Sequence, residues 1–433
     1  MVAKKKSRSS SPKSVKKAPT KPAKPAAAAK KKPATPKAAP KTTTKKVAPT
    51  KSVASKPSAK PKKRVFVSSL LGSSKKEETP SSSSSPTSRD LGLDFIGNFP
   101  VRDRGDSKKT DLKKQPTGPV FPVGDYNYSG RGTELGQTLI GEFLRVFAAK
   151  HTKDTLTPID LNMKLDRGEL DFTAQPVGTH KHLILKEGFE ALMTKKIDIF
   201  VQPMKDFPIA LPAGITLAAA IGRVDPRDAM VTRSTFGAIQ ELPSRAKVGA
   251  NSQRRIMQIR ALRPDIEIVT ARGSNADRIQ KLENGELDAV LMAWATLKRL
   301  NQSPRYYVAL QAEQMLPAAC QGIIGIACRT EDKDLIEKLR YVEDSESSWA
   351  SRCERAFLAK FGDYGDPPIG AMAHRKGTQD PWILDIVLGD PQSGDILRHR
   401  EIGTSRCKPE SLADKAFTGV LAKGGRKFYP FRS

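Results

Sequence analysis

The sequence predicts an α/β protein in which buried strands alternate with amphipathic helices. The first observation is a nearly continuous apolar run at residues 197–201, which indicates a strand of a sheet covered on both faces. The second is the repeated order of strand, turn and helix after residue 224. The third is the length of 433 residues, which is enough for two or three domains.

Spacing and breakers place the elements in order. Helical periodicity predicts helices at 135–147 and 184–195, and Pro203 ends the strand at 197–201 because proline cannot continue a central strand. An apolar return at 210–222 leads to Val224-Asp-Pro-Arg-Asp228, where proline and charges interrupt the pattern. Ser274 to Asp277 matches a capping box that opens a helix. The other expected elements are strands at 247–250, 266–270, 323–327 and 382–388, a strand or helix start at 288–294, and helices at 348–361 and 411–421.

Composition and pattern divide the chain into five regions. Residues 1–64 are a Lys/Ala/Pro-rich tail that we expect to be disordered, and residues 65–119 are a Ser/Pro-rich linker. Domain 1 is expected at 120–223 together with 318–340, and domain 2 at 224–317. A small α+β domain 3 is expected at 341–433.

The tail carries most of the net charge of the chain, which is +29 at pH 7. Residues 1–64 contain no acidic residue, and they are similar in composition to linker-histone tails. Lys60-Pro-Lys-Lys-Arg64 is similar to a nuclear import signal. Such a segment can bind nucleic acid by releasing counterions from the phosphates. The alternative role for the tail is a solubilising extension, and the sequence does not favour one role over the other. The tail suggests that the protein is located in the nucleus, with plastid or cytoplasm as alternatives. A transit peptide is disfavoured because the basic residues of the tail are nearly all Lys, whereas transit peptides are rich in Arg.

Several classes of protein are disfavoured by what the sequence lacks. It has no run of 18 apolar residues, so we expect no membrane span. The cysteines lack CxxC spacing, which indicates free thiols in a reducing compartment. Neither the cysteines nor the five histidines form a zinc motif, so we expect no bound metal. Separately, we expect the protein to be a monomer. The cysteines are Cys320, Cys328, Cys353 and Cys407.

A charged pair follows the strand at 197–201. Lys205 and Asp206 lie just beyond its carboxyl end, where ligands bind in open α/β sheets. This pair is therefore a candidate for chemistry. The alternative is a solvated turn with an ion pair.

Arginines gather at two consecutive strand-to-helix turns. The first turn carries Arg254 and Arg255, after a helix cap at Asn251 or Ser252. The second carries Arg272 and Arg278. Helix starts offer unpaired backbone amides and a favourable dipole, so this arrangement favours a ligand with several carboxylates or phosphates. The alternative is arginines that lie along helix surfaces.

Seven short segments, taken in order, resemble hydroxymethylbilane synthase, also called porphobilinogen deaminase. The resemblance covers roughly residues 124–423, and the chain is identified as a member of that family. The segments are Met204-Lys-Asp-Phe-Pro208, Val224-Asp-Pro-Arg-Asp-Ala229, Ser252-Gln-Arg-Arg255, Leu282-Glu-Asn-Gly-Glu-Leu-Asp-Ala289, Leu297-Lys-Arg-Leu300, Leu316-Pro-Ala with Gln321-Gly322, and Pro368-Ile-Gly370.

The resemblance implies two α/β domains similar to periplasmic binding proteins, which flank a cleft, and a third α+β domain that carries a cysteine. In the family this cysteine holds a dipyrromethane cofactor through a thioether, and four porphobilinogens are added in turn with loss of ammonia. Asp206 matches the catalytic aspartate, whose carboxylate stabilises the cationic pyrrole and helps to move protons. The residues that match the substrate-binding set are Arg131, Lys181, Lys205, Ser252, Arg254, Arg255, Arg272, Arg278 and Arg305.

The chain departs from the family at the cofactor anchor. Gly365 stands where the family has the cysteine, so the cofactor has no anchor there. Three other places around the cofactor also differ from the family, and there this chain has Gln202-Pro203, Ala250-Asn251 and Ser274. Cys320 is the one thiol we consider as a substitute, and a buried inert thiol is the alternative.

Three functions therefore stay open. The first is an enzyme of tetrapyrrole synthesis that uses an unanchored or relocated primer. The second is a binding or regulatory protein that closes its cleft around porphobilinogen, a linear polypyrrole carboxylate or another polycarboxylate. The third is a nuclear protein whose tail binds nucleic acid while the folded part serves as a module.

Overall fold

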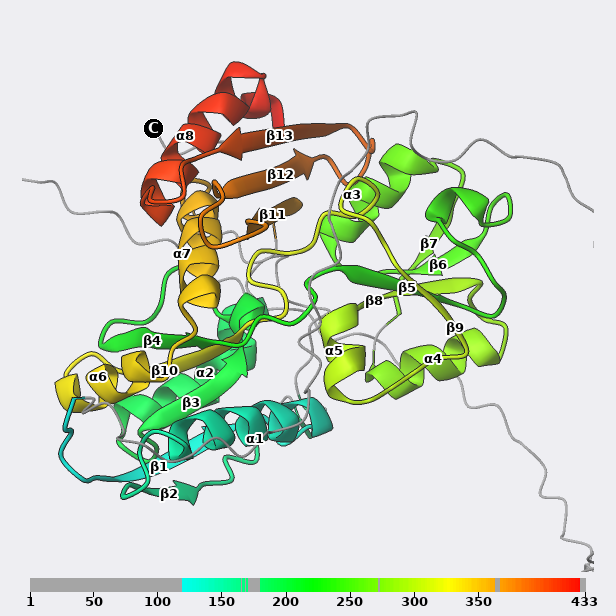
Figure 1. Ribbon diagram of the computed structural model, residues 1–433. Coiled ribbons are helices and arrows are strands. Elements are labelled where there is room, and N and C mark those ends of the chain that lie inside the picture. The colour runs from blue at the N-terminus through cyan, green and yellow to red at the C-terminus, as the bar shows by residue number, and fades with distance from the viewer. Residues whose placement is uncertain are drawn as a thin grey trace, which may run out of the picture. The chain divides into compact units, whose positions relative to one another are not determined.

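The first sheet combines strands from two distant parts of the chain. The computed structural model describes residues 119–164, 166–167, 169, 180–271, 273–362 and 367–428. The sheet has the strand order β2-β1-β3-β10-β4. β1 is parallel to β2 and β3, whereas the late strand β10 lies antiparallel between β3 and β4 (Figure 1). These strands are β1 (Asp125–Gly130), β2 (Thr155–Pro158), β3 (Ile199–Pro203), β4 (Ile215–Ile221) and β10 (Ile324–Arg329).

Both faces of this sheet are buried. Phe200 on β3 belongs to a core cluster that includes α2 and α7, whereas Ile199 and Val201 belong to one that includes α1 and α6. Successive residues of a strand point to opposite faces, so burial on both sides accounts for the continuous apolar run. The strand predicted at 197–201 is present, but it begins and ends two residues later, at Ile199 and Pro203, so Pro203 is its last paired residue. The helices are α1 (Glu134–Ala148), α2 (His180–Met193), α6 (Lys333–Tyr341) and α7 (Ser345–Ala359).

The second sheet has the strand order β7-β6-β8-β5-β9. β6 is parallel to β7 and β8, and β5 is antiparallel to β8 and β9. The predicted capping box opens α4: the Ser274 hydroxyl accepts from the Asp277 amide at 3.2 Å, and the Asp277 carboxylate accepts from the Ser274 amide at 2.8 Å. The elements are β5 (Asp228–Thr232), η2 (Ile239–Glu241), β6 (Lys247–Gly249), α3 (Gln253–Leu262), β7 (Glu267–Val269), α4 (Asn275–Glu283), β8 (Ala289–Ala293), α5 (Trp294–Arg299) and β9 (Tyr306–Ala309).

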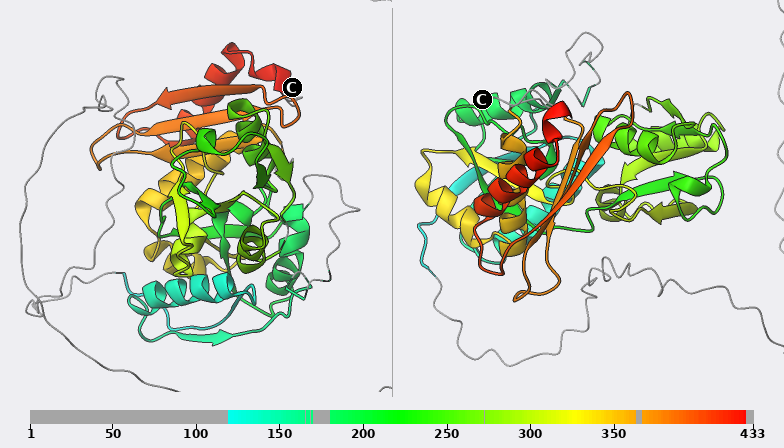
Figure 2. Two further views of the ribbon diagram at one scale, coloured as in Figure 1. Left: turned by 90° about the vertical axis from the view of Figure 1, so that its right-hand side faces the viewer. Right: turned by 90° about the horizontal axis from the view of Figure 1, so that it is seen from above.

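The third sheet is antiparallel, with the order β11-β12-β13. Helices α7 and α8 pack against each other and against this sheet (Figure 2). Trp349 on α7 stacks on Trp382 with ring centroids 3.9 Å apart. The elements are β11 (Ile369–His374), β12 (Ile383–Gly389), β13 (Ile396–Ile402), α8 (Pro409–Ala422) and η3 (Gly425–Phe428).

Two segments of the chain connect the first sheet to the second. Their glycines, Gly222 and Gly322, have φ angles of +46° and +88°, a region that favours glycine. A Cβ on Gly322 would lie 2.4 Å from the carbonyl oxygen of Val224. The guanidinium of Arg299, at the end of α5, donates to the carbonyls of Gly222 and Gly322, each at 3.0 Å. It also pairs with the Glu142 carboxylate of α1 at 3.1 Å, so one side chain joins both connections to the first sheet.

The predicted α/β class is confirmed, and the described residues form two mixed sheets and a smaller antiparallel one. None of the strands β1, β2, β5, β9, β11 and β13, nor the helix α6, was predicted from the sequence. β1 contains Asp125, Asn127 and Ser129, and its pairing on both sides supplies the order that its composition does not. The predicted tail and linker at 1–64 and 65–119 lie outside the described residues, except for residue 119.

Candidate functional site

The candidate site begins where β3 ends. Pro203 is the last residue of this strand, and the chain turns at once into the short 3-10 helix η1 (Met204–Asp206). The Met204 amide donates to the Ile323 carbonyl at 2.9 Å, which ties η1 to the loop before β10. Lys205 and Asp206 therefore stand on a turn at the carboxyl end of a buried strand, as the sequence predicts.

Helix α7 holds the segment that follows η1. The guanidinium of Arg355 donates to the carbonyls of Pro208 at 2.7 Å and Ile209 at 3.0 Å. Charged donors give stronger hydrogen bonds than neutral ones, so these contacts restrict the segment next to Asp206. The sequence did not indicate this role for Arg355.

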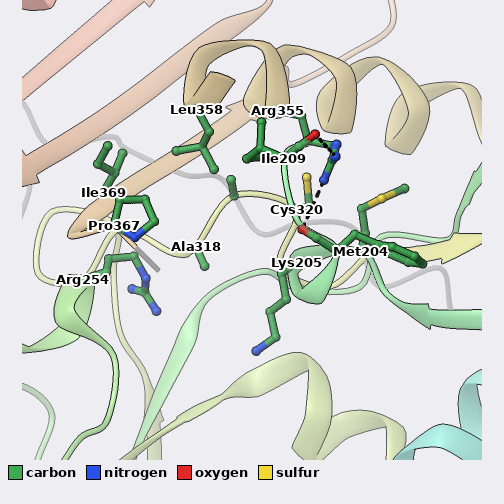
Figure 3. A pocket seen from close by; sticks show the side chains of 12 residues that line it. Met204, Lys205, Ile209, Arg254, Ala318, Cys320, Arg355, Leu358, Pro367 and Ile369 are labelled. Atoms are coloured by element: carbon green, nitrogen blue, oxygen red, sulfur yellow. Dashed lines mark hydrogen bonds between the residues drawn. The ribbon is translucent and has the colours of Figure 1, made fainter. Parts of the chain in front are cut away.

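A pocket lies between η1, α3, α7 and the loop before Gln321. Its apolar wall includes Met204, Phe207 and Leu358, and its cations are Lys205, Arg254 and Arg355. In Figure 3 the side chains of Lys205 and Arg254 extend into the same space beside Ala318. Cys320 also lines the pocket and is 1% exposed. The pocket thus combines apolar surface with positive charge.

Neighbouring charges on three elements act on Lys205. Burial lowers the pKa of Lys205, and the positive charges of Arg255 and Arg254 lower it further. The carboxylates of Asp206 and Asp228 oppose this shift in the pKa. These charges come from η1, β5 and α3, so the fold brings together residues that the sequence placed in two different turns.

Arg254 and Arg255 stand in the first turn of α3, and both bind one buried carboxylate. An Nη of Arg254 donates to Asp228 Oδ2 at 2.7 Å, and an Nη of Arg255 donates to Asp228 Oδ1 at 2.7 Å. The two arginine residues are 2% and 7% exposed. Asp228 is not among the residues predicted from the sequence, although the Val224-Asp-Pro-Arg-Asp-Ala229 segment that resembles the family contains it.

Among the remaining predicted residues, three arginines have partners of their own. The Arg278 guanidinium donates to the Gly273 carbonyl at 3.1 Å, and burial together with the charge of Arg255 lowers its pKa. Arg131 pairs with the Asp166 carboxylate at 2.8 Å, and the Arg305 guanidinium lies 5.2 Å from the centre of the Tyr306 ring. Ser252 is the N-cap of α3. Lys181 lies in α2, but its side chain is outside the described part of the chain, as are Arg272 and Gly365.

Neither a metal-binding cluster nor a membrane-spanning helix occurs in the described ranges. Within them, no three His, Cys, Asp or Glu side chains are grouped so that they could hold a metal ion. In the same part of the chain, no helix is both long and apolar enough to cross a membrane.

The chemistry of the pocket lining matches part of what a dipyrromethane group requires. Cations suit its carboxylates, and apolar side chains suit its rings. Gly365, however, offers no atom that could form a thioether. A dipyrromethane attached at position 365 therefore does not fit this sequence.

Comparisons with known proteins bear on this site. The family model described as "Porphobilinogen deaminase, dipyromethane cofactor binding domain" matches residues 159–337. The porphobilinogen deaminase of Roseiflexus sp. (strain RS-1) is 37% identical over 246 residues, which is 57% of this chain and 80% of the relative. That of Campylobacter concisus (strain 13826) is 33% identical over 249 residues, 57% of this chain and 79% of the relative. A solved L-cystine solute receptor of Neisseria gonorrhoeae aligns over 56% of this chain and 95% of its own, with 12% identity and a TM-score of 0.31, a likeness too weak to bear on fold or function.

Proposed function

We propose, from the fact that this chain belongs to the porphobilinogen deaminase family, that it acts in tetrapyrrole synthesis by binding porphobilinogen or a linear polypyrrole carboxylate. One observation carries this proposal: Lys205 and Arg254 line one pocket, and Asp206 follows Lys205 on the same turn. The ligand binds there with its carboxylates on the cations and its pyrrole rings against the apolar wall.

Each group in the pocket has a part in the proposal. Lys205 and Arg254 bind the acetate and propionate side chains, because ammonium and guanidinium groups pair with carboxylates. Asp206 stabilises a cationic pyrrole with its carboxylate and accepts or returns a proton. The other members of the proposed ligand-binding set are Arg131, Lys181, Ser252, Arg255, Arg272, Arg278 and Arg305.

The glycine at position 365 sets a limit on chemistry. A primer cannot be held there through a thioether, so we propose binding without the family's anchored chain growth. The protein then acts as a ligand-binding or regulatory member of the family.

One observation favours a second candidate function. Cys320 lines the same pocket as Lys205 and Arg254. A thiol at that place could hold a primer in place of position 365, which would preserve an enzyme that polymerises porphobilinogen with release of ammonia. Cys320 is 1% exposed, so the primer would have to displace the residues around it.

A single set of measurements separates the two candidates. The chain is produced in cells that make porphobilinogen, and its intact mass is measured before peptide mapping. Porphobilinogen is then added, and thermal stability and ammonia are followed. A ligand at 100 times its Kd stabilises a protein by about 2.7 kcal/mol. Stabilisation without adduct or ammonia supports the binding protein, whereas an adduct on Cys320 with ammonia release supports the enzyme.

Two variants test the location of the site. Replacing Arg254 or Arg255 by Ala is expected to abolish stabilisation by porphobilinogen, because the guanidinium that binds the carboxylate is lost. If both variants are stabilised as much as the wild type, the pocket assignment is wrong.

A further inference from the structure

Asp228 is a buried acid on which the two arginines of α3 converge. It is the first residue of β5 and is 0% exposed. Its two carboxylate oxygens accept hydrogen bonds from the guanidinium groups of Arg254 and Arg255 and from the side-chain Nε2 of Gln321, the last at 3.0 Å. Burial alone would raise the pKa of Asp228, but the two guanidinium groups hold it well below its usual value. Asp228 is therefore a carboxylate at neutral pH.

Each arginine has a second acceptor that completes its orientation. The Arg254 Nη that binds Asp228 also donates to the Leu316 carbonyl at 2.7 Å, and Arg255 donates to the Leu291 carbonyl at 2.9 Å. A guanidinium bound at two places loses its rotamer freedom during folding rather than during ligand binding. Ligand affinity is then higher, because less entropy is lost when the carboxylate arrives.

The charges of this group do not cancel. Two guanidinium groups and one carboxylate leave one positive charge on the trio formed by Asp228, Arg254 and Arg255. Two buried cations side by side without an anion would be strongly unfavourable, since burial of an unpaired charge is costly. The acid thus permits both arginines to lie inside the protein near Lys205 while a net attraction for an anion persists.

We propose that Asp228 is a positioning residue that orients Arg254 and Arg255, so that the trio binds one ligand carboxylate. This inference rests on the proposed function, because it concerns the same ligand. It adds a residue that neither touches the ligand nor reacts. It also gives the site a stoichiometry of one carboxylate for two arginines.

The variant Asp228→Asn tests the proposal, with porphobilinogen binding measured by calorimetry on folded protein. The amide keeps the size of the side chain but presents an NH2 donor to an arginine donor, so one guanidinium turns away. We expect binding about tenfold weaker or more, which corresponds to the loss of one charged hydrogen bond. A purely electrostatic role predicts tighter binding instead, because the variant gains one positive charge. A purely structural role predicts lower thermal stability with unchanged affinity. Either result overturns the proposal.

A matched control is available three residues earlier. Asp225 pairs with Arg227 at 2.7 Å, and this pair does not include either arginine of α3. Asp225→Asn is expected to leave porphobilinogen affinity within about twofold of the wild type, because its carboxylate pairs with Arg227 and not with Arg254 or Arg255. An equal loss in both variants would show that any nearby acid matters, and it would refute the specific role of Asp228.

A second variant serves if Asp228→Asn fails to fold. Gln321→Met keeps the volume of the side chain and removes the amide that donates to Asp228 at 3.0 Å and to the Pro226 carbonyl at 2.6 Å. We expect about threefold weaker porphobilinogen binding, since a neutral hydrogen bond contributes less than a charged one. Affinity equal to that of the wild type would overturn the proposal.

Citrate is the second probe, and it separates the two proposals. If the wild type binds citrate but not porphobilinogen, the proposed function fails, and the comparison of variants proceeds with citrate. If the wild type binds neither, the trio is not an anion site and the inference is wrong.

Discussion

Replacing Glu354 by Gln should loosen the junction beneath the pocket. Glu354 lies on α7 and is 0% exposed. One of its oxygens accepts from Arg223 at 2.6 Å and from the Ala373 amide at 2.7 Å, and the other accepts from the Cys320 amide. A single carboxylate thus joins the connection after β4, the pocket loop and β11.

The magnitude follows from these contacts. In either orientation the glutamine amide turns a donor toward a donor, so at least one buried backbone N–H loses its acceptor, at a cost of about 1–3 kcal/mol. Breaking a buried ion pair by removing one partner costs about 3–5 kcal/mol. The Arg223 side chain is 14% exposed, so water can solvate part of its charge. Because the two losses overlap, we expect a total decrease in the free energy of unfolding of about 3–4 kcal/mol.

Urea unfolding followed by tryptophan fluorescence measures this loss. Trp349 and Trp382 stack within the same unit as α7 and report on its unfolding. The control is Arg352→Ala on the same helix, since the pair that Arg352 makes with Glu410 has side chains 60% and 50% exposed. That change should cost less than about 0.5 kcal/mol. A Glu354→Gln variant within about 1 kcal/mol of the wild type would refute the reasoning.

Three other perturbations have defined outcomes. Arg299→Ala should lower the free energy of unfolding by about 2–4 kcal/mol, because two backbone carbonyls lose a charged donor. Glu142→Gln should lower it less, because the Glu142 side chain is 33% exposed, and the midpoints of urea unfolding of the two variants measure the difference. Because the pKa of Lys205 is lowered, this lysine loses its positive charge at a lower pH than an ordinary lysine does, so porphobilinogen affinity should fall as the pH rises into the alkaline range. The Lys205→Arg variant should keep its affinity in that range, because arginine stays charged. A fall of equal size in both proteins would contradict the role of Lys205. Deleting residues 1–64 should abolish salt-sensitive DNA binding in a filter or fluorescence assay, and unchanged binding after the deletion would exclude the tail as the DNA-binding segment.

Local signals predicted the parts of the fold that local forces build. The capping box at Ser274 depends on residues three positions apart, and the buried strand at 197–201 depends on a short apolar run, so both were predictable. β13 was not, because it mixes apolar residues with Arg398, His399 and Arg400, and its order comes from pairing with β12. Pairing partners are set by tertiary contacts, which override weak intrinsic strand preference.

By itself, the sequence determined the chemistry that is present: a Lys-Asp pair beyond a strand, arginines at helix starts, a basic tail, and glycine where a thiol is expected at position 365. Only the tertiary structure decided how these groups are paired. Asp228 binds Arg254 across 26 residues of chain, and Glu354 binds Arg223 across 131. Ion pairs between distant segments depend on how sheets and helices pack, and they produce no periodic pattern in the sequence. For that reason the two arginine-bearing turns are visible in the sequence, whereas the pairing of both α3 arginines with Asp228 is not.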